Sequence, residues 1–388
     1  MPALPHFLDE KIIEVTMPAR NPLASYLVKL ALDRSKSPLS LSTKLAASFD
    51  LVVASKFYQY VKPEDWLWCE DAGRDYYPFL NACPYCTYQD SFVQFNGHKP
   101  PSGQIGPVTA LAFRELLAAY FEATGKNCSV YVASEPIDLM VVDWDHKRVF
   151  VAEIKAGPLF TPPLVAAHSA ESMDTTSVLP LHHHSGTARR MDGRRINMFV
   201  PERSGIMEIP LSFGSIGGGK PLDLDLSLIF DEKPEYVLRY YNAWDIMWRA
   251  NLRRNRKEKL FWFVGGCGRP KHCGEGWPVN SSGVPVGTVS DNKTSVGMDR
   301  TDDIKKATFQ ALTLGVDFRS RSLDGWELMT GIASNLHAAR HESLYLKPYE
   351  NLVWKWDSSH HFYNLFDGIV TFTKSVFRNP ILRTIFDW

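Results

Sequence analysis

The stretch Glu135-Pro-Ile-Asp-Leu-Met-Val-Val-Asp-Trp-Asp-His-Lys-Arg-Val-Phe-Val-Ala-Glu-Ile-Lys155 carries the strongest structural signal in the chain. Two short apolar runs rich in β-branched residues, 137–142 and 148–154, lie on either side of residues 143–147, which are rich in turn formers. Apolar runs of this length joined by such a turn are typical of a β-hairpin. We therefore expect two antiparallel strands here, within the sheet of an α/β protein.

The register of this hairpin brings two acids and a lysine together. With the turn centred on Asp145–His146, Asp138 lies across from Glu153, on the same face and about 5 Å away at Cβ. Lys155 is two residues further along and shares that face. Two facing carboxylates repel unless a cation lies between them, and Mg²⁺ prefers oxygen ligands. Because a divalent ion polarises phosphoryl oxygens and activates bound water, the pattern predicts a Mg²⁺-dependent site for phosphodiester hydrolysis, with Lys155 assisting the water.

Asp138, fourteen intervening residues and then Glu153-Ile-Lys155 resemble the motif of the PD-(D/E)xK nuclease superfamily, which includes most type II restriction endonucleases. The chain departs from the motif in having Ile137 between the proline and the aspartate, and that proline is not a ligand in the family. The resemblance implies a restriction-endonuclease-like core, with a mixed β-sheet flanked by helices, and Mg²⁺-dependent, sequence-specific cleavage of double-stranded DNA. A homodimer would match the symmetry of a palindromic site. The alternative is a surface hairpin with a cross-strand pattern of charges.

The resemblance also implies roles for two helices. In the family, a helix before the catalytic hairpin often supplies an acidic residue, and Glu115 has this place in a helix expected over 107–125. A solvated glutamate is the favoured interpretation, because Glu115 falls opposite the apolar face of that helix. The strand with the Glu-x-Lys motif is commonly followed by a helix that directs Lys and Gln toward the site. If the helix expected over 301–315 completes the motif, Lys306 and Gln310 approach the site.

Asp291 and Lys293, at the end of a strand expected from Thr288, form a rival acidic-x-Lys pair. This pair ranks second because no well-placed hairpin aspartate precedes it. Within the same chemistry, a repair or mobile-element nuclease is the alternative to a restriction enzyme. From another class of protein, the alternative is a non-catalytic, zinc-stabilised nucleic-acid-binding protein in which the hairpin carboxylates are structural.

Cys83 and Cys86 have the Cys-x₂-Cys spacing that lets two thiolates bind one tetrahedral Zn²⁺. Cys69 and His98 are the nearest candidates for the remaining ligands, and Cys128 is an alternative to either one. Four protein ligands would close the site and make it structural. A redox pair or unliganded thiols are the other interpretations.

The chain is expected to divide into two parts. Residues 1–106 should form an N-terminal helical region with the zinc knuckle, and residues 107–388 the nuclease core. Polar residues and chain breakers cluster at about 156–232, which favours an inserted recognition region. Periodicity and end signals elsewhere predict helices over 21–32, 44–60 and 234–252, and strands over 260–264 and 326–334.

Contacts to DNA would have to come from local basic patches. Lys and Arg together number 43, as do Asp and Glu, so the net charge is zero, whereas nucleic-acid-binding proteins are often basic overall. The candidates are arginines in the inserted region and after the helix over 234–252: Arg189, Arg190, Arg194, Arg195, Arg253, Arg254 and Arg256. The alternatives are a solvated loop for the first group and favourable cations at a helix C-terminus for the second.

His337 and His341 are spaced one helical turn apart, which can suit zinc. No Glu follows the first histidine, so the metalloprotease pattern fails. Surface or packing histidines are the favoured interpretation.

The composition, with 45% hydrophobic and 22% charged residues, is typical of a soluble globular protein. No apolar run approaches the roughly 18 residues of a membrane span, and the N-terminus lacks a basic-then-apolar signal. Six cysteines in 388 residues do not make a disulfide scaffold. We expect an intracellular protein without membrane association, in a prokaryotic cytoplasm if the resemblance holds.

Overall fold

The chain folds into two compact units, each discontinuous in sequence. The computed structural model describes residues 4, 8, 12–14, 20–59, 66–69, 72–77, 83–89, 102–166, 196–211, 222–266, 281–282, 296–299, 301–319, 325–355 and 362–388. Unit 1 comprises Met1–Val52, Gly103–Pro158 and Ser295–Trp388, and unit 2 comprises Val53–Ser102 and Leu159–Thr294. The sequence suggested a single boundary at residue 106, whereas the observed division returns the chain to unit 1 twice.

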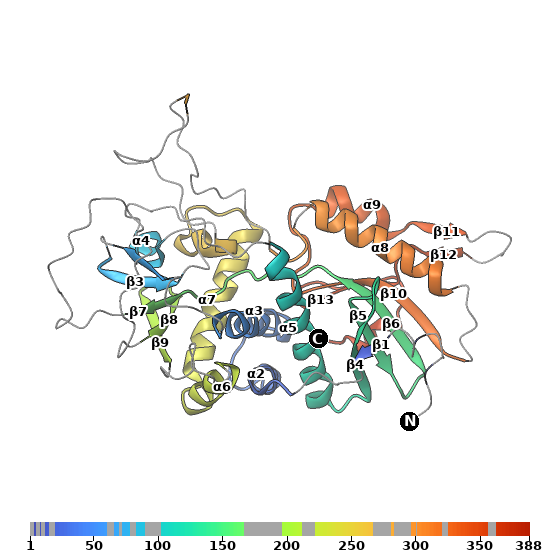
Figure 1. The fold of residues 1–388 in the computed structure, drawn as a ribbon, viewed down its shortest axis with the longest axis horizontal. Helices are drawn as coiled ribbons and strands as arrows, with labels where there is room; N and C mark the ends of the chain where they lie inside the picture. The colour runs from blue at the N-terminus through green and yellow to red at the C-terminus, as the bar shows by residue number, and fades with distance from the viewer. Residues whose placement is uncertain are drawn as a thin grey trace. The chain divides into compact units, whose positions relative to one another are not determined.

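Among the described residues, unit 1 holds a mixed sheet of seven strands in the order β1-β4-β5-β6-β10-β13-β14 (Figure 1). The strands are β1 (Ile12–Glu14), β4 (Cys128–Ala133), β5 (Leu139–Asp143), β6 (Arg148–Ile154), β10 (Glu327–Ser334), β13 (Gly368–Thr371) and β14 (Val376–Phe377). Strand β10 is parallel to β6 and β13, and the other pairings are antiparallel. A parallel pair needs a crossover connection, and α8 (Thr301–Arg319) lies on the connection between β6 and β10. An α/β protein with a mixed sheet is therefore confirmed.

The β5–β6 hairpin has the register expected from the sequence. Leu139 pairs with Ala152, Asp143 pairs with Arg148, and residues 144–147 form the turn. Every residue of β5 is buried, as is every residue of β6 after Arg148. Strands covered on both faces are expected to be apolar throughout rather than at alternate positions, which explains the two continuous apolar runs.

Helix α8 covers one face of this sheet and packs against β6 and β10 (Figure 1). Val151 of β6 lies in a buried cluster with Leu314 of α8. Because side chains alternate between the two faces along a strand, Glu153 also faces α8.

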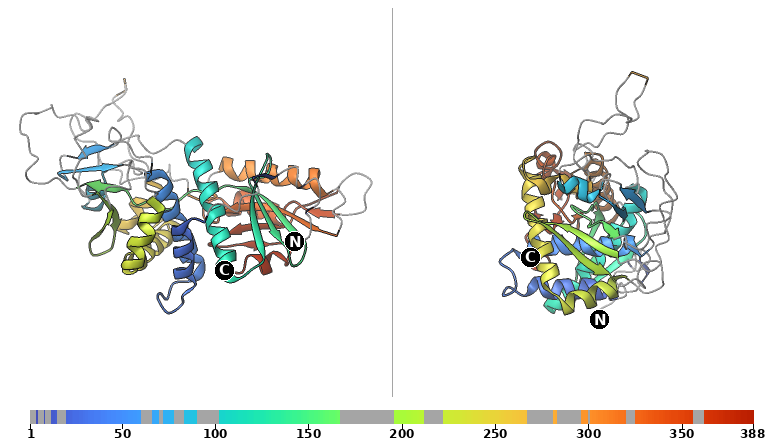
Figure 2. Two further views of the ribbon diagram at one scale, coloured as in Figure 1. Left: turned by 60° about the horizontal axis from the view of Figure 1, so that its bottom comes forward. Right: turned by 90° about the vertical axis from the view of Figure 1, so that its left-hand side faces the viewer.

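Helix α5 (Ser102–Thr124) lies on a different side of the sheet from α8 (Figure 2, left). Phe150, which alternates with Val151, contacts Phe386, with ring centroids 5.4 Å apart. The ring of Phe386 also lies 6.2 Å from that of Phe121 in α5. Helix α5 and the C-terminal aromatic residues thus cover the face opposite α8.

Two helices differ in length from the sequence expectation. Helix α5 begins at Ser102 rather than at Pro107, which lies inside the helix and costs it one internal hydrogen bond. Its end is as expected, because Gly125 has a φ of +69°, which suits the residue after a helix. Helix α8 continues past Gly315 to Arg319. A Cβ at Gly315 would lie 3.2 Å from the Trp354 ring, so this glycine permits close packing instead of ending the helix.

Unit 2 contains a five-stranded antiparallel sheet among the described residues, in the order β2-β3-β7-β8-β9. Its elements are β2 (Leu67–Cys69), β3 (Arg74–Tyr77), α4 (Pro84–Gln89), β7 (Leu164–Ala166), β8 (Ile196–Pro201), β9 (Ile206–Leu211), α6 (Leu222–Glu232), α7 (Glu235–Leu252) and the 3₁₀-helix η4 (Lys259–Gly266). Helix α7 packs against β8 and α6 packs against β9, and the right panel of Figure 2 shows these helices beside the sheet. Residues expected to form a separate insertion at 156–232 thus pair with strands from the segment before α5.

The apolar run 260–264 forms the helix η4, so the expectation of a strand there is wrong. All five residues are buried, and the run packs against α7. Short buried apolar runs do not distinguish a strand from a helix by periodicity. Helix α7 itself is confirmed, with Val237, Tyr241 and Trp244 fully buried along one side.

The remaining elements belong mostly to unit 1. They are α2 (Pro22–Leu32), α3 (Leu41–Tyr58), the π-helix η6 (Glu342–Leu346), α9 (Lys347–Glu350), β11 (Val353–Lys355), β12 (Phe362–Asn364) and α10 (Leu382–Ile385). Helix α2 is capped by Asn21, whose side chain accepts a hydrogen bond from the Ala24 N–H at 3.0 Å. Within the described ranges, none of the helices combines the length and apolarity needed to cross a membrane.

Candidate active site in unit 1

The hairpin brings Asp138, Glu153 and Lys155 together. Asp138 lies just before β5, and its Oδ2 accepts a hydrogen bond from the Ile154 N–H at 3.1 Å. This bond continues the β5–β6 pairing by one step and holds the Asp138 carboxylate beside Glu153. The Lys155 Nζ donates to Glu153 Oε1. Arg114 of α5 donates to the backbone carbonyl of Asp138 at 2.7 Å, which fixes the start of β5.

Glu153 is the buried acid of this group, with only 7% of its surface exposed. The pKa of Glu153 is raised to about 7, first by burial and then by the charge of Asp138, while Lys155 opposes both effects. Two acids that share one place disfavour each other's ionisation. The single ammonium of Lys155 therefore does not compensate fully for the burial of Glu153 beside Asp138.

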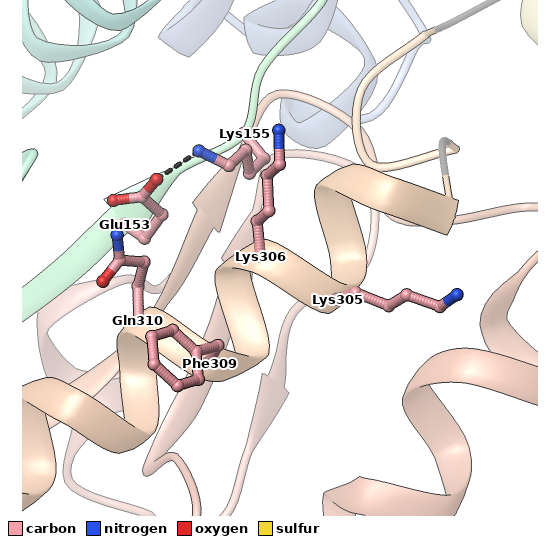
Figure 3. A pocket seen from close by; sticks show the side chains of 6 residues that line it. All are labelled: Glu153, Lys155, Lys305, Lys306, Phe309 and Gln310. Carbon is pink, nitrogen blue, oxygen red and sulfur yellow. Dashed lines mark hydrogen bonds and ion pairs between the residues drawn. The ribbon is translucent and has the colours of Figure 1, made fainter.

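A cavity of about 420 Å³ opens over Glu153 and Lys155, at the end of β6, and is lined on its other side by α8; Asp138 is not among its lining residues. Its lining residues are Glu153, Lys155, Lys305, Lys306, Phe309 and Gln310 (Figure 3). In Figure 3 the Gln310 amide lies beside Glu153, and Lys306 extends alongside Lys155, whereas Lys305 points away from them. The expectation that Lys306 and Gln310 approach the hairpin is confirmed.

The position of Phe309 was not expected from the sequence. Its ring is 67% exposed and lies at the cavity. Phe309 and Lys306 are three residues apart and therefore neighbours on the helix surface. An exposed aromatic ring near a lysine is suited to stacking on a base as well as to packing, and helical periodicity alone did not distinguish these roles.

Strand β10 fixes the chain just after the motif. The Lys155 N–H donates to the Ala333 carbonyl at 2.9 Å. The fully buried side chain of Asn335 donates to the Gly157 carbonyl at 2.8 Å and accepts from the Gly157 N–H at 3.0 Å. Asn335 thus acts like an additional strand partner. Sequence reasoning missed it, because no local pattern marks an asparagine that pairs with backbone 178 residues away.

Glu115 is buried, with 9% of its surface exposed, so the interpretation as a solvated glutamate is wrong. Its Oε2 accepts a hydrogen bond from Asn21 Nδ2 at 2.7 Å. Burial lowers the pKa of the neighbouring Arg114, and the charges of Asp138 and Glu115 oppose that effect. Glu115 is not among the residues that line the cavity. Arg114 interacts electrostatically with both Glu115 and Asp138.

The three cysteines predicted to bind zinc lie together in unit 2. Cys69 lies in β2, Cys83 just before α4 and Cys86 within α4, and their buried sulfurs are all within 4.8 Å of one another. Cys69 Sγ and Cys86 Sγ are 3.5 Å apart, close to the ~3.8 Å that two thiolates 2.3 Å from one tetrahedral zinc require. Burial raises the pKa of the Cys83 thiol well above its usual value, and the other two cysteines add to this.

Of the other candidate zinc ligands, Cys128 is not in this group. Cys128 lies in β4 of unit 1, whereas the three cysteines belong to unit 2. Burial raises the pKa of Cys128 to about 12. His98 lies outside the described residues.

Among the predicted DNA-contacting arginines, those after α7 can be described. Arg253 and Arg256 are exposed, whereas Arg254 has a φ of +51° and holds its guanidinium 5.7 Å from the Phe261 ring centroid. Arg254 therefore contributes to packing in unit 2. The arginines 189, 190, 194 and 195 and the rival pair Asp291 and Lys293 lie outside the described residues.

Comparison with known proteins gave no match: no family model, curated protein or solved structure is significantly similar to this chain.

Proposed function

We propose that unit 1 is a Mg²⁺-dependent DNA endonuclease with a restriction-endonuclease-like core, in which Asp138, Glu153 and Lys155 form the active site. The observation that carries the proposal is the pairing of Asp138 and Glu153 across one hairpin, with Lys155 beside them. Lys306 and Gln310 of α8, the last helix before β10 among the described elements, face Glu153 and Lys155. This combination is what the resemblance to PD-(D/E)xK nucleases implied.

The donor set fits Mg²⁺. Both candidate ligands are carboxylates, and Mg²⁺ is commonly held by one or two carboxylates and its own waters. The pKa of Glu153 is raised first by burial and then by the charge of Asp138, so a cation beside both carboxylates would stabilise their ionised forms. When bound, the ion would polarise a phosphoryl oxygen and lower the pKa of a coordinated water.

The surrounding residues supply the rest of the chemistry. The ammonium groups of Lys155 and Lys306 lie where they can stabilise the negative charge that develops on a phosphate. The Gln310 amide can donate to a phosphate oxygen or orient a water beside Glu153. The cavity over these groups leaves room for a phosphodiester. Lys155 contacts Glu153 directly, so its ammonium is already oriented before substrate binds.

Zinc and DNA recognition belong to the same proposal. Cys69, Cys83 and Cys86 would hold Zn²⁺, with His98 as the fourth ligand, and four protein ligands make the site structural. Arg253 and Arg256, with the arginines between 189 and 195, would contact DNA. We further propose a homodimer acting on a specific sequence in double-stranded DNA. A repair or mobile-element nuclease would use the same active site on other DNA structures.

DNA cleavage by purified full-length protein tests the proposal. Phage-sized DNA is incubated with protein and Mg²⁺, beside a chelator control, Glu153→Gln and the matched control Glu122→Gln. Glu122 of α5 is 51% exposed and pairs only with Arg20 among the described ion pairs. We expect discrete fragments from wild type and Glu122→Gln, and intact DNA from the other two samples. A smear would favour a repair or degradative nuclease. Cleavage that persists in Glu153→Gln would exclude this active site, and intact DNA in every sample would favour a binding protein.

A further inference from the structure

A second group of side chains that could hold a metal ion lies in unit 1, and none of them lines the cavity. His337 follows β10, Glu342 begins the π-helix η6, and Glu350 ends α9. One ligand atom from each residue lies within 4.8 Å of the other two. The segment 335–341 is not an α-helix, so the spacing of His337 and His341 in the sequence did not reveal this arrangement.

The imidazole of His337 is the unusual member of the group. It is 4% exposed, and neither ring nitrogen makes a hydrogen bond to any described residue. Its Nε2 is 3.5 Å from Glu342 Oε1, which is long for a hydrogen bond. Glu350 Oε1 is also buried without a hydrogen bond to the described part of the chain. Buried polar atoms in folded proteins almost always have a partner, and an ion is one recognised explanation for an exception.

We propose that His337, Glu342 and Glu350 bind a divalent transition-metal ion, with Zn²⁺ as the best fit. Ligand atoms at about 2.1 Å from a tetrahedral zinc are ~3.4 Å apart, so small side-chain rotations would bring these three atoms into range. One imidazole and two carboxylates suit zinc and similar metals, whereas Mg²⁺ prefers oxygen ligands alone. Three protein ligands leave the fourth position to water.

Lys374 is the natural competitor of the metal. Its Nζ contacts Glu342 Oε1, the same oxygen that lies 3.5 Å from His337 Nε2. Lys374 is 55% exposed, so its side chain can move into solvent when a metal takes this oxygen. Removing the ammonium should therefore strengthen metal binding, which is the opposite of the effect expected for the ligands.

A metal bound here would link the π-helix η6 to the end of strand β10. Glu342 and Glu350 lie on the two helical segments after His337, and His337 donates its backbone N–H to Thr373 Oγ1 at 3.0 Å. The π-helix packs against α8, and Leu346 shares a buried cluster with Ile304 of α8. A metal here would stabilise the position of α8 whether or not unit 1 is a nuclease, so the inference does not rest on the proposed function.

Metal titration of the full-length protein tests the inference. Co²⁺ replaces Zn²⁺ as a visible probe, because a site with nitrogen and oxygen ligands gives d–d bands without the thiolate charge-transfer band of the cysteine site. The variants are His337→Gln, Glu350→Gln, Lys374→Met and the control Glu122→Gln, with circular dichroism to check folding. Zn²⁺ stoichiometry is measured in parallel by equilibrium dialysis.

We expect His337→Gln and Glu350→Gln to lose one metal equivalent, or to bind it at least about 10-fold more weakly. Lys374→Met should bind it several-fold more tightly, and Glu122→Gln should match wild type. The thiolate band should be the same in all variants. If His337→Gln does not fold, the half-buried Glu350 decides the question. Unchanged stoichiometry and affinity in Glu350→Gln would overturn the proposal and leave His337 as a packing residue.

Discussion

Asp138 lies across the β5–β6 hairpin from Glu153, with its Oδ2 3.1 Å from the backbone nitrogen of Ile154. Burial, reinforced by the charge of Asp138, raises the pKa of Glu153 to about 7. Groups with such pKa values cluster at functional sites, where local stability is sacrificed for chemistry. Because the two acids lie together, we expect replacement of Glu153 to affect stability and activity in opposite directions.

Glu153→Gln should stabilise the metal-free protein while abolishing cleavage. A carboxyl whose folded-state pKa lies above its unfolded value of about 4.5 binds its proton more tightly in the folded protein. Its contribution to stability is present below about pH 4.5 and is lost as the pH rises through about 7. At pH 8 we expect the variant to be more stable by about 1 kcal/mol, after allowance for screening by solvent. Urea unfolding with chelator at pH 5 and pH 8 measures this, and lower stability at pH 8 would mean that the Lys155 ion pair dominates.

Mg²⁺ should stabilise the wild-type protein but not its ligand variants. A ligand that binds only the folded state stabilises by about 2.7 kcal/mol at 100 times its Kd. We expect Mg²⁺ to raise the melting temperature of wild type and Glu122→Gln, and to leave Asp138→Asn and Glu153→Gln unchanged. The shift in wild type should diminish below about pH 7, where the proton competes for Glu153. Equal shifts in all four proteins would place the ion elsewhere.

Much of this site could be predicted from the sequence because its parts are local. The turn residues and the two apolar runs determine the register, and the register determines that Asp138 and Glu153 meet. Lys306 and Gln310 were expected from the resemblance, which places a Lys and a Gln on the site-facing side of the helix that follows, and residues four apart share a helix face. The three cysteines were likewise found from their spacing and proximity.

Long-range packing explains what the sequence did not predict. Glu115 was expected in solvent because it lies opposite the apolar face of its helix, but Asn21 covers it from 94 residues away. The pairing of β3 with β7 joins segments on either side of α5, and no periodicity marks such a partner. Phe309 lines the cavity and Gly315 lies against Trp354. The helical pattern of the sequence indicates neither of these positions.

Lys306→Ala should reduce cleavage by on the order of 10- to 100-fold without a large effect on stability, because it removes a charge that stabilises the developing phosphate charge. Gln310→Ala should reduce cleavage less, since it removes a neutral donor. Lys29→Ala in α2 is the matched control, because Lys29 is also an exposed helical lysine of unit 1 and does not line the cavity. Steady-state cleavage at saturating Mg²⁺ is the measurement. An equal loss in Lys29→Ala would indicate general attraction of DNA instead of a role at the site.

Asn335→Ala should destabilise unit 1 and loosen the chain that carries Lys155. The substitution leaves the buried Gly157 N–H without its acceptor, while the Gly157 carbonyl keeps its bond from Gly297 at 2.9 Å. One orphaned buried donor costs about 2 kcal/mol. Urea unfolding measures the loss, and amide hydrogen exchange at residues 155–157 should increase relative to β5. Unchanged exchange there would show that β10 alone holds the strand end.

Cys86→Ser should remove zinc and lower the stability of unit 2, whereas Cys128→Ser should do neither. The two variants carry the same cysteine-to-serine change, but only Cys86 lies with Cys69 and Cys83. Because metal binding supplies part of the folding free energy of a structural site, chelator should destabilise wild type to the level of Cys86→Ser. Zinc content per chain and thermal unfolding measure both effects. Zinc retained in Cys86→Ser would refute the cysteine site, and zinc lost in Cys128→Ser would mean that β4 contributes a ligand after all.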